Sequence, residues 1–281
     1  MPLFKNKTYG KYRPDILWFR SLGYLRRRHY TKRGLRPPSW PFLSGDTYRS
    51  FARHTWDEVD IPNFSIDEIR EGDIIFVSGH LKEFLAEFAP RIDVPFYLLS
   101  SNDDGSVSEL EIEQIRETKC LHWWAANLIV ESDLVTPIPL GLENERLCWF
   151  GDVRDIKRVQ KLSEKTSKQE KIVWGFTVGN NPVERGPIKT ALEANPLAVE
   201  LPRMNPYSYR REIIKYKYLA SPPGHGPDCH RTWEALALGI TPVLLTSTMA
   251  LQFKRQGYPI ILLDSPEDFA TFPASYTRVR D

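Results

Sequence analysis

Short apolar runs alternate with segments of helical spacing along most of this chain. Residues 73–79, Asp-Ile-Ile-Phe-Val-Ser-Gly, predict a strand buried on both faces, as in a parallel sheet. Further strands are expected at 94–100, 123–127, 134–141, 171–178, 199–201, 217–221, 242–245 and 260–263, and helices at 44–53, 81–88, 108–118, 152–171, 187–194, 208–215, 228–238 and 249–256. This alternation predicts an α/β fold with doubly wound parallel sheets.

The alternation is interrupted by a charged segment with few apolar residues, which we interpret as a connecting or surface helix. The predicted organisation is a basic arm at 1–40, an N-terminal lobe at 41–150, a connecting helix at 151–170 and a C-terminal lobe at 171–281. Each lobe is expected to be Rossmann-like, with a cleft between the two. The last residues, 269–281, are expected to form a loosely held tail.

Positive charge is concentrated at the start of the chain. Residues 1–40 contain eleven Lys and Arg residues and one acid, Asp15, although the whole chain has a net charge of only +2. A basic arm on an acidic body predicts a polyanion or an anionic membrane surface as a neighbour. Residues 15–28 are expected either to form an amphipathic helix lying on a bilayer or to belong to a solvated arm, and any membrane contact is expected within residues 1–36.

The remaining bulk properties exclude several classes of protein. With 41% hydrophobic residues, the body is not a disordered chain. No apolar run is long enough to cross a membrane, and the N-terminal segment lacks the apolar core of a secretory signal. Three well separated cysteines favour reduced thiols and argue against a structural zinc. We therefore expect a cytoplasmic protein that binds peripherally at the inner face of the membrane.

One loop-to-helix segment carries the strongest chemical signal. Residues 221–234, Ser-Pro-Pro-Gly-His-Gly-Pro-Asp-Cys-His-Arg-Thr-Trp-Glu, predict a loop that opens a helix near Asp228, which Gly239 ends. Free N–H groups and the dipole at such a helix start favour a phosphate. Arg231 and Glu234 share a helical face, where the Arg can bind a diphosphate and the Glu can accept hydrogen bonds from sugar hydroxyls. The alternative is an ordinary turn with an Arg–Glu surface pair.

Further residues around this segment are candidates for donor binding. A second loop, residues 177–185, follows a predicted strand, as a phosphate-binding loop does in a βα unit. This loop contributes Asn181 and Arg185, although a solvated Arg on a surface turn is the alternative. Candidates at the helix start itself are Gly224, Gly226, Asp228 and His230.

A candidate general base lies in the N-terminal half. Residues 100–104, Ser-Ser-Asn-Asp-Asp, follow a predicted strand, and the carboxyl ends of parallel strands face the ligand crevice. Asp104 is our candidate base for an acceptor hydroxyl, and His80 and Asn102 are candidates for the acceptor side. The segment also has the composition of a hydrogen-bonding turn, and a single His is more often structural.

Several motifs are missing from the chain. It contains no Asp-x-Asp pair to hold a divalent metal under a nucleotide diphosphate, no P-loop and no GxSxG segment. The His residues also lack the spacing of metal ligands. We therefore expect no bound metal and no cofactor, and a nucleotide-diphosphate sugar as co-substrate.

The segment 223–243 resembles the donor-binding block of exostosin-like glycosyltransferases, which have the GT-B fold. The matching pattern is the Pro/Gly loop, then Arg231, then Glu234 and the final Gly-Ile-Thr-Pro-Val. Residues 44–49, 124–127 and 137–142 look like those of a bacterial surface-polysaccharide branch of these enzymes. The resemblance extends over about residues 40–265, and its specific part is 221–243.

The resemblance implies a GT-B-like glycosyltransferase that is metal-independent and inverting. Arg185 and Arg231 would bind the diphosphate of the nucleotide sugar, and Glu234 the ribose or the sugar. The implied acceptor is a glycan or a lipid-linked oligosaccharide of surface polysaccharide synthesis. The alternative is a non-catalytic nucleotide- or glycan-binding protein of the same fold. Nucleic acid is not expected as a partner, because the body has no matching basic stripe.

Overall fold

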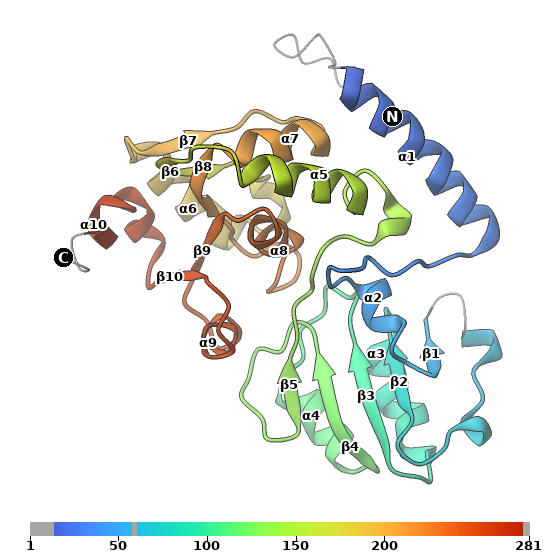
Figure 1. Cartoon of the computed structure of the whole chain (residues 1–281). Helices are drawn as coiled ribbons and strands as arrows, with labels where there is room; N and C mark the ends of the chain where they lie inside the picture. The colour runs from blue at the N-terminus through green and yellow to red at the C-terminus, as the bar shows by residue number, and fades with distance from the viewer. Residues whose placement is uncertain (1–13, 58–60, 278–281) are drawn as a thin grey trace.

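The chain folds into two parallel five-stranded sheets, one in each half of the sequence (Figure 1). The computed structural model describes residues 14–57 and 61–277, without the side chains of residues 14–20, 62, 276 and 277. The fold is therefore α/β, as the alternation of apolar runs and helical segments predicted.

The first sheet orders its strands as they occur in the chain, from β1 to β5. They are β1 (His54–Trp56), β2 (Ile74–Val77), β3 (Phe96–Ser100), β4 (Cys120–Ala125) and β5 (Val135–Pro137). Ser100 at the end of β3 pairs with Val77 and Ala125, so the carboxyl ends of β2, β3 and β4 lie level. Each strand is therefore followed by its neighbour in the same direction across the sheet. With right-handed crossovers, the connecting segments lie on one face of the sheet, and the direction of winding does not reverse.

The second sheet has the order β10-β9-β8-β6-β7. Its strands are β6 (Gln169–Trp174), β7 (Ala198–Glu200), β8 (Tyr216–Ala220), β9 (Thr241–Leu245) and β10 (Ile261–Leu263). The chain moves outward from β6 to β7 and then crosses to β8 on the other side of β6. The winding therefore reverses between β6 and β8, and such a switch point is where open α/β sheets bind ligands. The doubly wound topology that we predicted is found in this sheet only.

Helices cover both faces of the second sheet. They are α5 (Val153–Ser163), α6 (Pro182–Ala194), α7 (Pro206–Ile213), α8 (His230–Ala237), α9 (Thr248–Arg255) and α10 (Ala274–Thr277), with short η6 (Val178–Asn180) and η7 (Pro266–Ala270). Val173 packs with Trp233 and other residues of α5, α7, α8 and α9, whereas its neighbour Ile172 packs with Leu192 of α6 on the opposite face. Successive strand residues point to opposite faces, which explains why β6 supplies both cores.

The first sheet is covered by shorter elements. They are α2 (Gly45–Arg49), α3 (Leu81–Glu83), α4 (Glu109–Arg116), η1 (Ile61–Asn63), η2 (Ile66–Glu68), η3 (Phe84–Phe88), η4 (Ala89–Arg91) and, beyond β5, η5 (Glu145–Leu147). Leu98 faces Phe84 and α4, and Leu99 faces Tyr48 of α2. Ser44 starts α2 by accepting the Thr47 N–H at 3.2 Å, as the predicted turn and helix at 44–53 required.

Helix α1 (Pro14–Arg33) lies beside the body (Figure 1). Gly23 fits closely against Trp149 and Tyr207, since a Cβ there would lie 3.1 Å from each side chain. Arg26 forms ion pairs with Glu145 and, at 3.2 Å, with Asp152. A helix is therefore present at 15–28, and a glycine and an arginine anchor it on the body. Its apolar and polar residues are not separated onto opposite sides, so the expected amphipathic pattern is not found. Residues 1–13 of the predicted basic arm lie outside the described residues.

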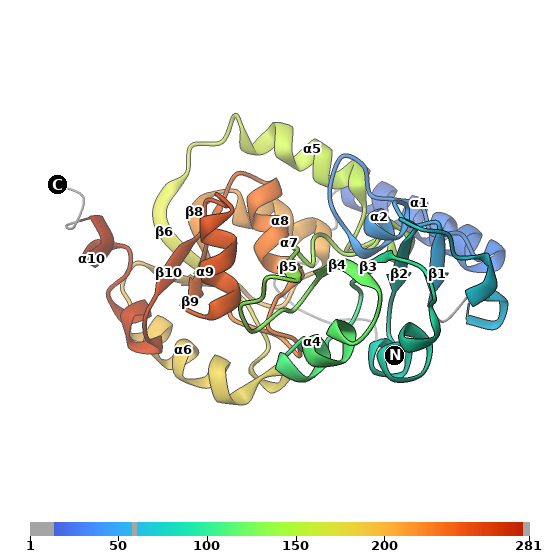
Figure 2. The same cartoon turned by 90° about the horizontal axis from the view of Figure 1, so that it is seen from below.

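The two halves of the chain are in direct contact. Gln252 and Gln256 of α9 donate to the carbonyls of Val130 and Pro137, each at 3.0 Å. Leu140, just beyond β5, joins the core around Trp233 of α8. Figure 2 shows the same arrangement from below, with α8 and α9 on the side of the second sheet that faces β5.

Two predicted helix boundaries differ most from the structure. The helix expected at 152–171 ends at Ser163, and Gln169 already belongs to β6, because the exposed polar start of that strand has no apolar signal. Helix α6 begins at Pro182 rather than at 187, since Asn181 caps it and Pro is tolerated in the first turn.

The tail expected to be loosely held is packed as far as it is described. Phe269 and Phe272 are fully buried against the second sheet, and the Asn195 amide donates to the Phe269 carbonyl at 2.6 Å. The short edge strand β1 was missed altogether, because three residues carry too little pattern to be recognised.

Candidate functional site

Helix α8 follows β8 after the loop at residues 221–229, and its first turn lies close to the carboxyl end of β8, at the switch point of the second sheet. Its N-cap, Cys229, has extended backbone, and Thr232 in the first turn shares a hydrogen bond of 2.8 Å with Ser221 at the end of β8. Gly239 follows the helix with a φ of +66°, the left-handed conformation that glycine adopts readily. The helix predicted to open near Asp228 and to end at Gly239 is confirmed.

Two arginines from different elements meet at this helix start. Arg231 is half-buried in the first turn of α8, and Arg185 is buried in α6. Both guanidinium groups lie against the ring of Phe176, at 6.0 Å and 5.7 Å from its centroid. Phe176 follows β6, so the pair lies at the carboxyl ends of β6 and β8.

Backbone carbonyls hold both guanidinium groups in place. Arg185 donates to the carbonyls of Pro223 (2.6 Å) and Thr177 (2.9 Å), and Arg231 donates to Gly175 at 3.4 Å. Within the described part of the chain, neither arginine has a carboxylate within ion-pair distance. Burial, together with the positive charge of Arg231, lowers the pKa of Arg185 from its ordinary value. Two adjacent positive charges that form no ion pair with a carboxylate favour an anion, although the nearby Glu234 carboxylate also stabilises the charge of Arg231.

Glu234 lies one turn along α8 and is tied to a buried ion network. Its Oε1 accepts from Arg210 at 3.0 Å, and Arg210 also pairs with Asp155 at 2.9 Å. Arg210 is fully buried and donates to the carbonyls of Trp149 and Phe150 as well. The network therefore fixes the direction of the Glu234 carboxylate, beside the arginine pair and at the surface edge of α8.

Asp228 is a contact between the two halves of the chain. It is 4% exposed and accepts the N–H groups of Leu140 (2.8 Å), Cys229 (2.7 Å) and the Trp233 indole (2.6 Å). Its own N–H donates to Asn127 at 3.1 Å. Burial raises the pKa of Asp228 to about 6, against the lowering effect of these donors. The carboxylate therefore bonds to Leu140 of the first half and to Cys229 and Trp233 of the second half.

The other candidates at the helix start have distinct surroundings. His230 shares a hydrogen bond of 2.8 Å between Nδ1 and the Gly141 carbonyl, and Asn181 caps α6 by accepting the Glu184 N–H at 3.3 Å. A Cβ at Gly224 would lie 3.5 Å from the Arg185 guanidinium, and one at Gly226 only 2.9 Å from the Asp104 carbonyl. The loop between these two glycines therefore runs from the arginine pair to the turn at residues 103–105.

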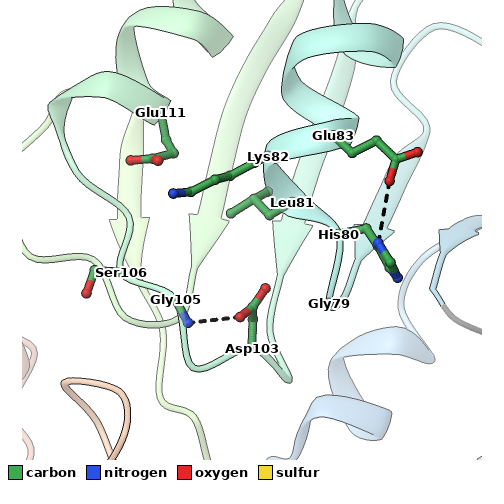
Figure 3. Close-up of a pocket in the computed structure, with 9 residues that line it drawn as sticks. All are labelled: Gly79, His80, Leu81, Lys82, Glu83, Asp103, Gly105, Ser106 and Glu111. Atoms are coloured by element: carbon green, nitrogen blue, oxygen red, sulfur yellow. Dashed lines mark hydrogen bonds and ion pairs between the residues drawn. The ribbon is translucent and has the colours of Figure 1, made fainter.

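A separate pocket lies at the carboxyl ends of β2 and β3 (Figure 3). It has a volume of about 360 Å³ and is lined by Gly79, His80, Leu81, Lys82, Glu83, Asp103, Gly105, Ser106 and Glu111. Lys82 and Glu111 point toward each other across it. Asp103 Oδ1 accepts the Gly105 N–H at 2.9 Å, while His80 turns toward Glu83, at 3.4 Å.

Of the candidate residues predicted in the N-terminal half, His80 lines this pocket, whereas Asp104 and Asn102 do not. Asp104 is exposed, and it is the neighbouring Asp103 that lines the pocket. Asn102 has a left-handed φ of 62°, and its Oδ1 accepts from Asn144 at 2.9 Å. Gly45 packs tightly against the Asn102 side chain, so Asn102 lies beneath the turn, against α2.

Sequence reasoning missed the aromatic part of the arginine site. Phe176 follows the last residues of β6 and Tyr209 belongs to α7, and both lie close to Arg231. Burial raises the pKa of the Tyr209 hydroxyl, which the charge of Arg231 partly counteracts. A Phe directly after an apolar strand gives no signal of a ligand site, so these residues are recognisable only in three dimensions.

Comparison with known proteins gives no family for this chain: no family model matches it, and no curated protein is significantly similar to it. Among the described residues, no group of three or more His, Cys, Asp and Glu side chains is arranged to hold a metal ion. None of the helices in the described ranges is long and apolar enough to span a membrane.

Proposed function

We propose that this chain transfers a sugar from a nucleotide-diphosphate donor to a hydroxyl group of a glycan or lipid-linked acceptor. One observation carries the proposal: Arg185 and Arg231, which form no ion pair with a carboxylate of the described residues, meet at the switch point of a doubly wound sheet. A diphosphate matches this arrangement in charge and in position, because guanidinium groups bind phosphate oxygens through charge-assisted hydrogen bonds.

In this proposal the two halves form a GT-B-like pair of lobes. The nucleotide sugar binds at the start of α8, and Glu234 contacts a hydroxyl of the ribose or the sugar. The acceptor occupies the pocket at the ends of β2 and β3. The loop between Gly224 and Gly226, which contacts both Arg185 and the backbone of Asp104, supports a short path between the two sites.

The proposed reaction is a displacement at the anomeric carbon. A carboxylate of the turn at 103–104 accepts the proton of the acceptor hydroxyl, whose oxygen then forms the new bond to the anomeric carbon. The bond from that carbon to the diphosphate oxygen breaks, and the nucleoside diphosphate leaves with the electron pair. Arg185 and Arg231 stabilise the negative charge that develops on the leaving group, as preorganised donors do.

Nucleotide binding provides the first test. Isothermal titration of the full chain with UDP, GDP and dTDP is expected to find at least one ligand, and CMP, which is a monophosphate, should bind more weakly than that ligand. Replacing Arg231 by Gln removes a charge-assisted contact of about 1.5–3 kcal/mol, so the Kd should rise at least tenfold. Arg154→Gln, at an exposed position of α5, is the matched control and should leave the Kd unchanged. Equal effects of both variants, or no binding by any nucleotide, would refute the proposal.

Turnover provides the second test and separates an enzyme from a binding protein. Release of nucleoside diphosphate is measured with the nucleotide sugar and a mixture of glycan acceptors. Asp103→Ala and Asp104→Ala should keep donor binding, and the one that lacks the base should lose turnover. Binding without any turnover in the parent would indicate a non-catalytic nucleotide-binding protein.

A further inference from the structure

The second half of α1 and the stretch that links it to the first sheet are basic, without any acidic residue. Between residues 21 and 45 the chain has six Arg and Lys residues and no Asp or Glu. Two of the six face the body, since Arg26 pairs with Glu145 and Asp152, and Arg36 pairs with Asp46 and Asp57. The other four are exposed, and none of them forms an ion pair with a carboxylate of the described residues, although Arg27 lies over the ring of Trp149: Arg27, Arg28, Lys32 and Arg33.

The exposed charges share a helical face with apolar side chains. Leu25, Arg28 and Lys32 are spaced by three and four residues, so they lie on one side of α1. Leu25 is 61% exposed and the adjacent Tyr24 is 58% exposed. The opposite side, with Gly23 and Arg26, is the one that contacts the body. The outer face therefore presents positive charge and apolar surface together.

Apolar exposure continues along the connector that follows α1. Leu35 and Trp40 are the large hydrophobic side chains exposed there, and the ring of Trp40 packs edge to face, at 5.5 Å, on that of Phe51, which is exposed just after α2. With Tyr24 and Leu25, five of the twelve exposed large hydrophobic residues among the described residues lie between positions 24 and 51. Exposed apolar groups are thus frequent in the same segment of the chain as the exposed positive charge.

We propose that the outer face of α1, defined by Tyr24, Leu25, Arg28 and Lys32 and extended by the exposed Arg33 of its last turn, binds an anionic lipid bilayer. The basic side chains contact the lipid headgroups, while Leu25 and Tyr24 enter the boundary between headgroups and acyl chains. A nucleic acid would use the same charges but has no comparable apolar layer for Leu25. The observations therefore favour the membrane, and they do so independently of the proposed glycosyl transfer.

Sedimentation with lipid vesicles tests this surface in the full chain. Vesicles of phosphatidylcholine with 30% phosphatidylserine, a composition chosen at roughly the anionic content of a cytoplasmic leaflet, are compared with pure phosphatidylcholine. Each basic residue near such a surface contributes about fivefold to the partition coefficient, so the triple variant Arg28→Ala, Lys32→Ala, Arg33→Ala should bind about a hundredfold more weakly. Binding should also weaken as the salt concentration rises.

Two further variants make the result specific. The triple variant Lys157→Ala, Lys161→Ala, Lys165→Ala removes the same charge from exposed positions of α5 and the residues after it, and should bind anionic vesicles as the parent does. The variant Tyr24→Ser, Leu25→Ser keeps all charges, and should lose about tenfold in vesicle binding because it removes the inserted apolar groups. Since all these positions are exposed, circular dichroism should show an unchanged fold.

Three outcomes would overturn the proposal. The first is equal binding of the parent to neutral and anionic vesicles. The second is an equal loss in the α1 and α5 triple variants, which would indicate a general charge effect. The third is tighter binding to a duplex oligonucleotide than to anionic vesicles, with no effect of Tyr24→Ser, Leu25→Ser on either, which would identify the surface as a nucleic-acid site.

Discussion

Replacing Asp228 by Ala should destabilise the chain by about 3 kcal/mol. The change leaves three buried N–H donors, those of Leu140, Cys229 and the Trp233 indole, without their acceptor. At about 2 kcal/mol for each orphaned donor, the loss is about 6 kcal/mol. Removing the carboxylate also relieves the cost of keeping it charged at pH 7, which is about 3 kcal/mol for a pKa raised to about 6. The loss of about 6 kcal/mol less the regained ~3 kcal/mol leaves the expected destabilisation of about 3 kcal/mol.

Asp228→Asn provides the sharpest comparison. Asn keeps one acceptor oxygen, which can serve the Leu140 and Trp233 donors that now share Oδ2. It loses only the contact with the Cys229 N–H and, like Ala, carries no charge. By the same counting, the orphaned Cys229 N–H costs about 2 kcal/mol and the lost charge returns about 3 kcal/mol, so the variant should be about as stable as the parent. Asp104→Ala, at an exposed position, is the control and should change stability by less than about 0.5 kcal/mol.

Urea denaturation followed by tryptophan fluorescence measures these differences. The reasoning is refuted if Asp228→Ala is as stable as the parent, or if Ala and Asn have equal effects. Nucleotide titration of the same variants tests the role expected from the sequence. If Asp228 contacts the donor directly, Asp228→Asn should lose affinity while it keeps its fold. If it only joins the two halves, Asp228→Asn should bind the nucleotide as the parent does.

Three further predictions use other contacts. The pKa of Asp228 is about 6 in the folded chain and about 4 in the unfolded chain, so the folded chain binds the proton more tightly and stability should fall as pH rises from about 4 to 6. The free energy of unfolding of the parent and of Asp228→Asn, measured by denaturation across this range, should differ in its slope by up to about 1.4 kcal/mol per pH unit. Arg210→Met should cost about 3–5 kcal/mol in thermal denaturation, because it leaves the buried Asp155 carboxylate with one arginine fewer and releases Glu234; an unchanged Tm would contradict the network. Gly226→Ala should lower stability by about 1–3 kcal/mol, since its Cβ would lie 2.9 Å from the Asp104 carbonyl, whereas Gly224→Ala should be tolerated at 3.5 Å from Arg185; similar melting curves for the two would argue against this packing.

The sequence predicted local elements well where the apolar pattern was strong. The strand at 73–79 and the helix opened by the loop at 221–229 were both located correctly, because buried strands and glycine-ended helices have marked local signals. It failed where local signals conflicted with long-range packing. The polar start of β6 was read as helix, and Phe269 and Phe272 were assigned to a loose tail although the second sheet buries them.

The candidate site divides in the same way. Residues 221–234 and Arg185 could be singled out because Gly, Pro, Arg and Glu at those spacings already suggest phosphate chemistry. Their neighbours could not, because nothing near Phe176 or Tyr209 in the sequence indicates that both lie beside Arg231. Likewise, only the turn at 103–105 decides that Asp103, rather than Asp104, lines the pocket of the first half.

By itself the sequence determined the fold class, the helix at the strongest loop and the surplus of positive charge near the start of the chain. Each depends on residues that are close together in the chain, where spacing and composition act directly on the backbone. Only the tertiary structure decided that β8 lies next to β6, that Arg185 and Arg231 meet at the ring of Phe176, and that Asp228 joins the two halves. These facts depend on which distant segments pack together, and that is set by the burial of whole faces rather than by any local pattern.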